Sequence, residues 1–160
     1  MKKYEFTDET KQFCGKVLHR IRAVRNFSGV KKGDLGGFIE SEDNLSHDGE
    51  AWVGENARVY ENARVSENAW VSDNSKIYGT AEVYGNACVF ENACVYGNAC
   101  VYGNAWVYGN AWVGGNTETH GTWIFGEARI YSNEDLKEME IRNERRINRR
   151  NSLCGTPIRR

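Results

Sequence analysis

The chain has 160 residues, 40% of them hydrophobic, and a formal net charge of −1 at pH 7, which suits one domain and excludes no partner by itself. It has no apolar run long enough to span a membrane, and its polar start, MKKYEFTDET, does not resemble a signal peptide. Five cysteines, an odd number, are expected to be reduced thiols in the cytoplasm.

Residues 1–38 are predicted to form an N-terminal strand and hairpin cap. We expect strands over residues 3–7 and 16–24, joined through residues 10–15. A repeat protein needs such a cap because its first coil would otherwise expose the core and an unpaired strand edge. The alternative is a ligand site on VKKGDLGG, residues 30–37. Phosphate-binding loops, however, run into a helix and carry Lys with Ser or Thr, which this segment lacks.

Residues 51–116 form the centre of the chain, with 11 consecutive hexads of the type A-x-V-x-G-N and no insertion. Position 1 is Ala in every hexad except at Ser75, and position 6 is Asn except at Thr80. Position 3 is always Val, or Ile at residue 77. A repeat this strict indicates that identical structural units stack on one another.

The pattern of each hexad predicts a short strand followed by a turn. Positions 1 and 3 are two residues apart and therefore point to one face of a strand, whereas positions 2 and 4 point to the other. Gly and Asn at positions 5 and 6 tolerate the backbone angles of a tight turn. Such a short strand cannot bury its Ala/Val face alone, so successive coils must stack and pair their backbones.

These hexads resemble the repeat of left-handed parallel β-helix proteins, whose best-known members are trimeric acyltransferases. The resemblance covers roughly residues 39–131 and implies three hexads per triangular coil, with the branched aliphatic residue inward. The run VKKGDLGGFIESEDNLS, residues 30–46, followed by such repeats, also resembles small proteins of bacteria and of their phages or prophages, most of unassigned function. The fold is widely shared, so it does not determine function.

The solenoid is expected over residues 39–133, with degenerate coils at both ends. In the first coil, IESEDN and LSHDGE place Ile39 and Leu45 at position 1 and His47 at position 3. At the other end, TETHGT keeps the phase and WIFGE, residues 123–127, is one residue short. At about 18 residues per coil the solenoid has roughly five coils and stands on the order of 25 Å tall.

Residues 134–160 are predicted to be a basic C-terminal helix and tail. Ser132 and Asn133 offer an N-cap, and the helix is expected over residues 134–150, followed by a mobile tail that contains Pro157. Its arginines suit the helix dipole near the C-terminus. They form a candidate basic end: Arg142, Arg145, Arg146, Arg149 and Arg150.

The outward positions form three faces, because hexads three apart stack on the same face. Tyr residues at position 4 are expected to stack between coils. One face carries an aromatic ladder that we predict to be an exposed surface for a partner or for self-association. Its residues are Trp52, Trp70, Phe90, Trp106, Tyr108 and Trp123.

No residue set indicates chemistry or a metal site. Cys88, Cys94 and Cys100 are six residues apart, so their thiols should lie on three different faces and cannot share one zinc ion or a disulfide. The three histidines, His19, His47 and His120, are scattered over the cap and the end coils. We expect no catalytic residues, no metal and no cofactor.

The sequence therefore predicts an all-β fold, a left-handed parallel β-helix with an N-terminal β-hairpin cap and a C-terminal α-helix. The predicted function is non-enzymatic binding to a host or phage protein, as a phage- or prophage-derived inhibitor of a host defence system such as a CRISPR effector. Homo-oligomers, dimers or trimers, are also expected. One alternative is an acyltransferase-like enzyme acting between subunits. Another is nucleic-acid binding through the Arg-rich end, where residues 141–160 hold seven Arg and one Glu.

Overall fold

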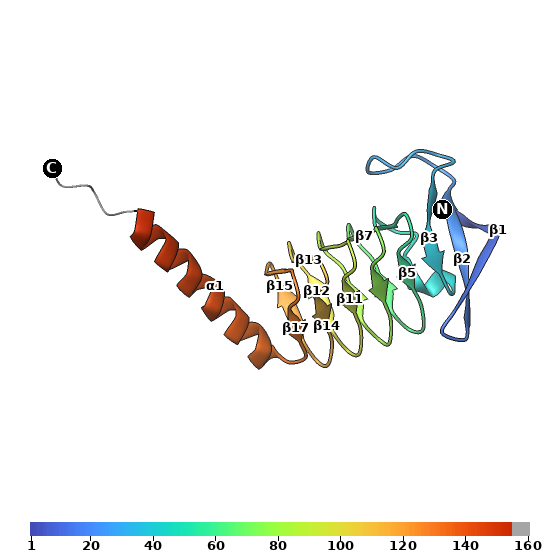
Figure 1. The fold of residues 1–160 in the computed structure, drawn as a ribbon. Coiled ribbons are helices and arrows are strands. Elements are labelled where there is room, and N and C mark those ends of the chain that lie inside the picture. The colour runs from blue at the N-terminus through green and yellow to red at the C-terminus, as the bar shows by residue number, and fades with distance from the viewer. Residues whose placement is uncertain (155–160) are drawn as a thin grey trace.

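The computed structural model describes residues 1–154 and has the predicted fold class, a parallel β-solenoid of about five turns. An N-terminal hairpin lies at one end of the solenoid, and a single helix, α1, leaves the other end and points away from the coils (Figure 1). The solenoid thus separates two different end structures. The first strand of the hairpin begins at Tyr4, and α1 begins at Asn133.

The hexads form very short strands at positions 2 and 3, and all their partners are in neighbouring coils. Backbone ladders therefore run between coils, as the repeat predicts. The strands are β4 Trp52–Val53, β5 Arg58–Val59, β6 Arg64–Val65, β7 Trp70–Val71, β8 Lys76–Ile77, β9 Glu82–Val83, β10 Cys88–Val89, β11 Cys94–Val95, β12 Cys100–Tyr102, β13 Trp106–Val107, β14 Trp112–Val113, β15 Glu118–His120, β16 Trp123–Ile124 and β17 Arg129–Ile130.

Three sheets form the sides of the solenoid. One sheet has the order β16-β13-β10-β7-β4, a second β15-β12-β9-β6, and the third continues from the solenoid into the cap as β1-β2-β3-β5-β8-β11-β14-β17. Position 3 residues pair with one another, for example Val71 with Val89 and Val89 with Val107. These side chains and the position 1 alanines are fully buried, so the inward phase predicted from the repeat is confirmed.

Each corner between strands is a turn with a left-handed residue at position 5. Gly79 and Gly97 have φ values of 71° and 64°, and Glu61 and Glu67 adopt 57° and 58°. A non-glycine residue with these angles has an unfavourable backbone conformation. The acidic side chains have a compensating role, because Glu67 Oε2 accepts a hydrogen bond from the N–H of Gly85, one coil further on, at 2.8 Å.

The cap consists of a hairpin that extends one sheet of the solenoid. Strands β1 (Tyr4–Phe13) and β2 (Lys16–Ala23) are antiparallel, and β3 (Leu35–Ile39) joins β2 to β5 of the first coils. The prediction that residues 10–15 form a long connection is wrong. The strands continue to a two-residue turn, where Cys14 and Gly15 both have positive φ, as tight hairpins require.

The first coil has a different phase from the one predicted. Ile39 pairs with Val59 and Leu45 with Val65, so both are at position 3 and not at position 1. Their branched side chains therefore continue the Val column of the later coils. The 3₁₀ helix η1 (Glu42–Asn44) lies between these two residues and closes the coil.

The last coil also differs from the prediction in the place where one residue is missing. Trp106 pairs with Trp123 and Val107 with Ile124, which makes residues 122–127 a complete hexad. The short unit is therefore TETHG, residues 117–121, and not WIFGE. Trp123 and Ile124 pair with Trp106 and Val107 of the preceding coil, and this pairing determines which unit is short.

Helix α1 extends over Asn133–Cys154, longer than the predicted residues 134–150. Ser132 Oγ accepts a hydrogen bond from the N–H of Asp135 at 3.2 Å, which confirms an N-cap at this point. Leu136 is buried against the last coil, whereas residues 144–152 are exposed. The remainder of the predicted tail, with Pro157, lies outside the described residues. No helix within residues 1–154 is long and apolar enough to cross a membrane.

Candidate interaction surface

The largest exposed group of aromatic side chains lies on the sheet β16-β13-β10-β7-β4, near α1. Positions 2 and 4 of each strand point outward there, and exposure increases towards the last coil. Trp106 is 38% exposed, Phe125 47% and Trp123 53%. We name the following five side chains the aromatic surface: Phe90, Trp106, Tyr108, Trp123 and Phe125.

Ring stacking between coils orders this surface. Trp106 and Trp123 stack with ring centroids 5.0 Å apart and an interplanar angle of 11°. Phe90, Tyr108 and Phe125 form a second column, with centroid distances of 5.0 and 5.4 Å. Phe90 also meets the edge of Trp106 at 5.7 Å. The two columns together present an apolar surface whose side chains are held by their neighbours.

Trp52 does not belong to the exposed surface, so its prediction as part of the partner face is wrong. It is only 3% exposed, because Phe27 of the cap packs against its ring with centroids 5.4 Å apart. The backbone of β3 also lies against the Trp52 ring at Gly36, where a Cβ would be only 2.6 Å from the ring. Trp70 is half-buried, and Cys88 separates it from Trp106 in the ladder.

Sequence reasoning missed Phe125 because it placed the missing residue in the wrong hexad. With Trp123 at position 2, Phe125 takes position 4 directly above Tyr108. The signal was present in the sequence, since TWIFGE keeps an aliphatic residue, Ile124, at position 3.

The other two faces contain aromatic columns that are less exposed or less extensive. Tyr60, Tyr78 and Tyr96 stack at 5.2 and 5.4 Å, as predicted, and Phe13 of the cap covers Tyr60. Burial raises the pKa of the Tyr60 hydroxyl well above its ordinary value. On the same face, the Arg129 guanidinium lies 5.0 Å from the Trp112 ring. This column contributes to the packing of the cap and the coils.

The three central thiols lie on three different sheets, as their spacing predicted. Cys88 is on β10, Cys94 on β11 and Cys100 on β12. Burial raises the pKa of all three thiols, which keeps them protonated at neutral pH. Among residues 1–152, no three His, Cys, Asp or Glu side chains come together in a group that could hold a metal ion.

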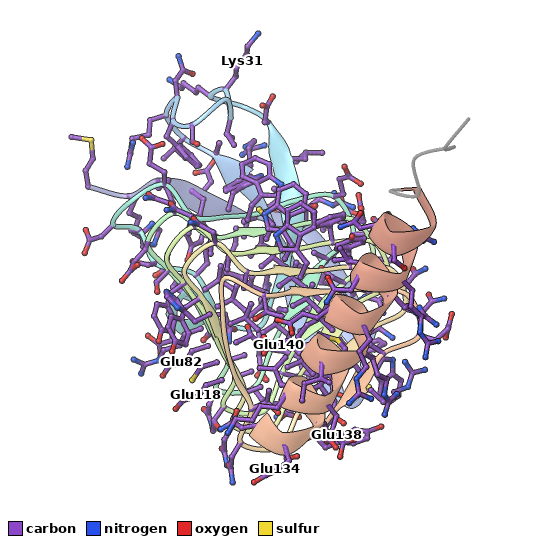
Figure 2. The ribbon with its side chains drawn as sticks, turned by 90° about the vertical axis from the view of Figure 1, so that its left-hand side faces the viewer. Lys31, Glu82, Glu118, Glu134, Glu138 and Glu140 are labelled. Carbon is purple, nitrogen blue, oxygen red and sulfur yellow. The ribbon has the colours of Figure 1, made fainter. Side chains whose placement is uncertain are left out.

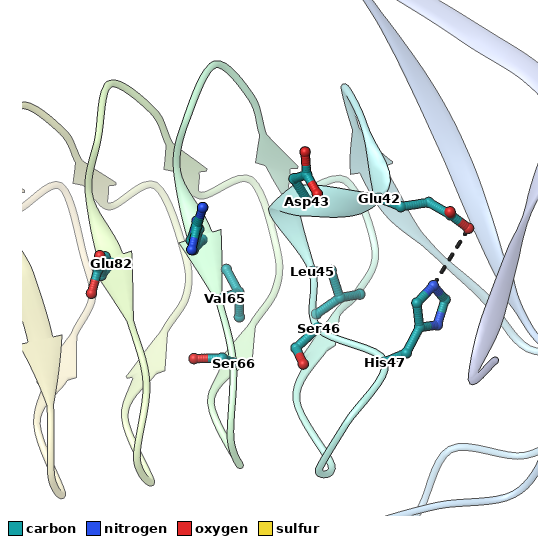
Figure 3. A pocket seen from close by; sticks show the side chains of 9 residues that line it. Glu42, Asp43, Leu45, Ser46, His47, Val65, Ser66 and Glu82 are labelled. Carbon is teal, nitrogen blue, oxygen red and sulfur yellow. Dashed lines mark ion pairs between the residues drawn. The ribbon is translucent and has the colours of Figure 1, made fainter. Parts of the chain in front are cut away.

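Each histidine ring stacks on an aromatic ring. His19 lies 4.6 Å from Phe6 and His120 5.0 Å from Tyr102. His47 stacks on Tyr4 at 4.1 Å, and its Nδ1 accepts a hydrogen bond from the N–H of Lys3. Its Nε2 faces Glu42 at 3.4 Å beside a hollow of about 410 Å³ next to the cap (Figure 3). The three histidines thus lie at separate places along the molecule.

The arginines of the predicted basic end are three and four residues apart and therefore lie along one side of α1. Arg142 pairs with Glu138 at 3.5 Å, one turn earlier in the helix. Arg146 and Arg150 line an open groove of about 650 Å³ between α1 and the last coil, together with Trp123, Phe125, Met139 and Ile147. The groove therefore continues directly from the aromatic surface. Viewed from the C-terminal end of the solenoid, α1 lies in front of the coils, with Glu134 near its start (Figure 2).

Charge is segregated along the chain. Residues 39–133 hold four basic and thirteen acidic residues, a net charge of −9. Residues 1–38 hold nine basic and four acidic residues, a net charge of +5. The near-neutral total thus combines an acidic solenoid with a basic cap and a basic helix end. The predicted basic end comprised only the C-terminal arginines, whereas the cap is basic as well.

The coils, their registers and their buried Val column define a parallel β-solenoid protein. The chain is similar to a family described as the YdcK beta solenoid repeat, whose model matches residues 57–73, 93–109 and 99–115. All three segments lie within the hexads. The comparison with curated proteins gave no match. The similarity therefore supports the fold and leaves function to be argued from the surface.

Proposed function

We propose that the protein is a non-enzymatic binding protein whose rigid solenoid presents the aromatic surface to a protein partner. The observation that carries this proposal is the stacked and exposed pair Trp106 and Trp123 beside the Phe90, Tyr108 and Phe125 column. Interfaces draw most of their binding energy from a few such side chains. Because the rings are already held in columns, little side-chain entropy is lost on binding.

The charge distribution supports a partner of a particular kind. A solenoid with a net charge of −9 is suited to a positively charged groove on another protein, and salt would weaken such a complex. Together with the resemblance of residues 30–46 to phage and prophage proteins, this supports a phage-derived inhibitor of a host defence system, such as a CRISPR effector. The proposal of an inhibitor is tested by measuring whether DNA competes with this protein for binding to the same partner.

A pair of tryptophans with equal exposure gives the main test. Trp106 and Trp112 are both 38% exposed, but Trp106 is on the aromatic surface and Trp112 is on another face. Proteins captured from a bacterial lysate by the intact chain would be identified, purified and titrated against both variants. We expect Trp106→Ala to weaken binding by about 30-fold or more and Trp112→Ala to change it little. Equal effects of the two variants would contradict the proposal.

A further inference from the structure

The groove beside α1 lies at the end of the aromatic surface and is lined by apolar and charged side chains. Trp123 and Phe125 form one wall, and Met139 and Ile147 of α1 form the other. Ile147 is 57% exposed, and the exposed fractions of Trp123 and Phe125 are about one half. These side chains face a space of about 650 Å³ that nothing in residues 1–152 fills.

The second half of α1 lacks the packing that normally stabilises a helix. Leu136 is buried and Met139 packs against the core, but each of residues 144–152 is exposed. Helices in proteins are stabilised mainly by packing of an apolar face and less by intrinsic propensity. The exposed half, which carries Ile147 on the groove side, is therefore available to a partner.

The charges of α1 reverse along its length. Residues 134–141 hold four acidic residues and one Lys, whereas residues 142–150 hold five Arg and one Glu. An antiparallel copy of the same helix would place the acidic half of each beside the basic half of the other. A parallel copy would place like charges together. The acidic and basic halves of α1 are therefore self-complementary in an antiparallel pair, as the surface of a two-fold symmetric dimer must be.

We propose that the groove binds helix α1 of a second copy of this chain, so that two molecules exchange antiparallel helices about a two-fold axis. Each α1 then packs between Trp123 and Phe125 of its partner and the partner's helix, and Ile147 becomes buried. The proposal rests on the proposed function only in that Trp123 and Phe125 belong to both surfaces. Phe90, Trp106 and Tyr108 stay available for a different protein.

A nucleic acid or an acidic peptide fits the groove less well. Glu140 and Glu144 line it together with Arg146 and Arg150, so a uniformly negative ligand would meet repulsion along half of its length. Only a partner whose charge reverses in the same way pairs with both halves.

The test is sedimentation equilibrium of the purified full chain, with two isoleucines of the same helix as a matched pair. Ile147 lines the groove, whereas Ile141 is 47% exposed and does not line it. We expect a dimer that Ile147→Lys weakens by about 30-fold or more and Ile141→Lys leaves unchanged. A monomer at all concentrations, or equal effects of the two variants, would overturn the proposal. Because only purified chain is used, the result does not depend on whether another protein binds.

Charge variants test the antiparallel arrangement. Arg146→Glu/Arg150→Glu makes residues 142–150 neutral, with three Arg and three Glu, and Glu134→Lys/Glu138→Lys makes residues 134–141 weakly basic, with three Lys and two acidic residues. Each variant alone should dimerise more weakly than wild type with an unchanged circular dichroism spectrum, and an equal mixture should form a heterodimer that pairs the acidic half of one variant with the basic half of the other. Added salt should weaken the wild-type dimer, because the pairing is attractive. A wild-type dimer that strengthens with salt would overturn the antiparallel arrangement.

Discussion

The indole rings of Trp106 and Trp123 stack 5.0 Å apart, although 17 residues separate them instead of the 18 of the regular repeat. The solenoid accommodates the missing residue in the preceding corner and keeps the two rings in register. Stacking between coils is therefore maintained where the sequence repeat becomes irregular. The same position in the first coil is occupied by Trp52, which the cap covers.

This contrast predicts different costs for two tryptophans at the same position of the repeat. Trp52→Ala leaves a cavity under the cap and should lower the free energy of unfolding by about 3–5 kcal/mol. Trp123→Ala removes a ring that is 53% exposed and should cost on the order of 1 kcal/mol. Urea unfolding followed by circular dichroism measures both. Similar costs would contradict the burial of Trp52 by the cap.

Replacing Thr119 in the core by Val should stabilise the protein. It occupies position 3 in the Val column, pairs with Val101, and its buried Oγ1 has no hydrogen-bond partner. Thr119→Val keeps the shape and removes an unsatisfied polar atom, so the free energy of unfolding should rise by about 1–3 kcal/mol.

The control for this prediction is Thr117, whose Oγ1 donates to the carbonyl oxygen of Gly114 at 2.8 Å. Thr117→Ala loses that hydrogen bond and should be neutral or destabilising. The melting temperature should therefore rise for Thr119→Val and stay unchanged or fall for Thr117→Ala. A lower melting temperature for Thr119→Val would show that its hydroxyl is satisfied.

Two corner glycines at equivalent backbone angles predict unequal effects of an added methyl group. Gly115 and Gly121 have φ values of 63° and 70°, so Ala at either position has an unfavourable backbone conformation. A Cβ at Gly115 would collide with the carbonyl oxygen of Tyr131, whereas one at Gly121 meets nothing within 4 Å.

Gly121→Ala should therefore cost about 1–2 kcal/mol, the cost of the left-handed backbone alone. Gly115→Ala should cost more, because the last coil before α1 must move. Denaturant unfolding of the two variants provides the comparison. Equal costs would show that the backbone at Tyr131 moves freely.

The lowered pKa of Lys3 predicts that the free energy of unfolding rises between about pH 8 and 10.5. Its ammonium is fully buried and donates to the carbonyl oxygen of Ala51 at 2.6 Å. Burial, and then the charge of Arg25, lowers the pKa of Lys3 from 10.5 to about 8. Between these values the unfolded chain keeps a proton that the folded chain has released, so the free energy of unfolding increases with pH.

The measurement is the unfolding free energy of wild type minus that of Lys3→Met at several pH values, which cancels the other titrating groups. The difference should be constant below about pH 7 and should increase from pH 8 to 10. A flat difference across that range would mean that the pKa of Lys3 is not lowered in the folded chain.

The sequence alone determined the solenoid, because its evidence is local and repeated eleven times. Small and branched side chains two residues apart define one inward face, and 18-residue spacing defines which hexads stack. The position of Val95 in the core and the separation of Cys88, Cys94 and Cys100 onto three sheets follow from those two periods.

The tertiary structure decided what happens where the repeat ends, because there the phase depends on side-chain volume and on contacts distant in sequence. Ile39 and Leu45 join the Val column because they pair with Val59 and Val65 of the next coil. Phe27 and Gly36 bury Trp52, and this contact is not visible in the hexad pattern. The direction of α1, which creates the groove beside Trp123 and Phe125, likewise depends on how Leu136 and Met139 pack on the last coil.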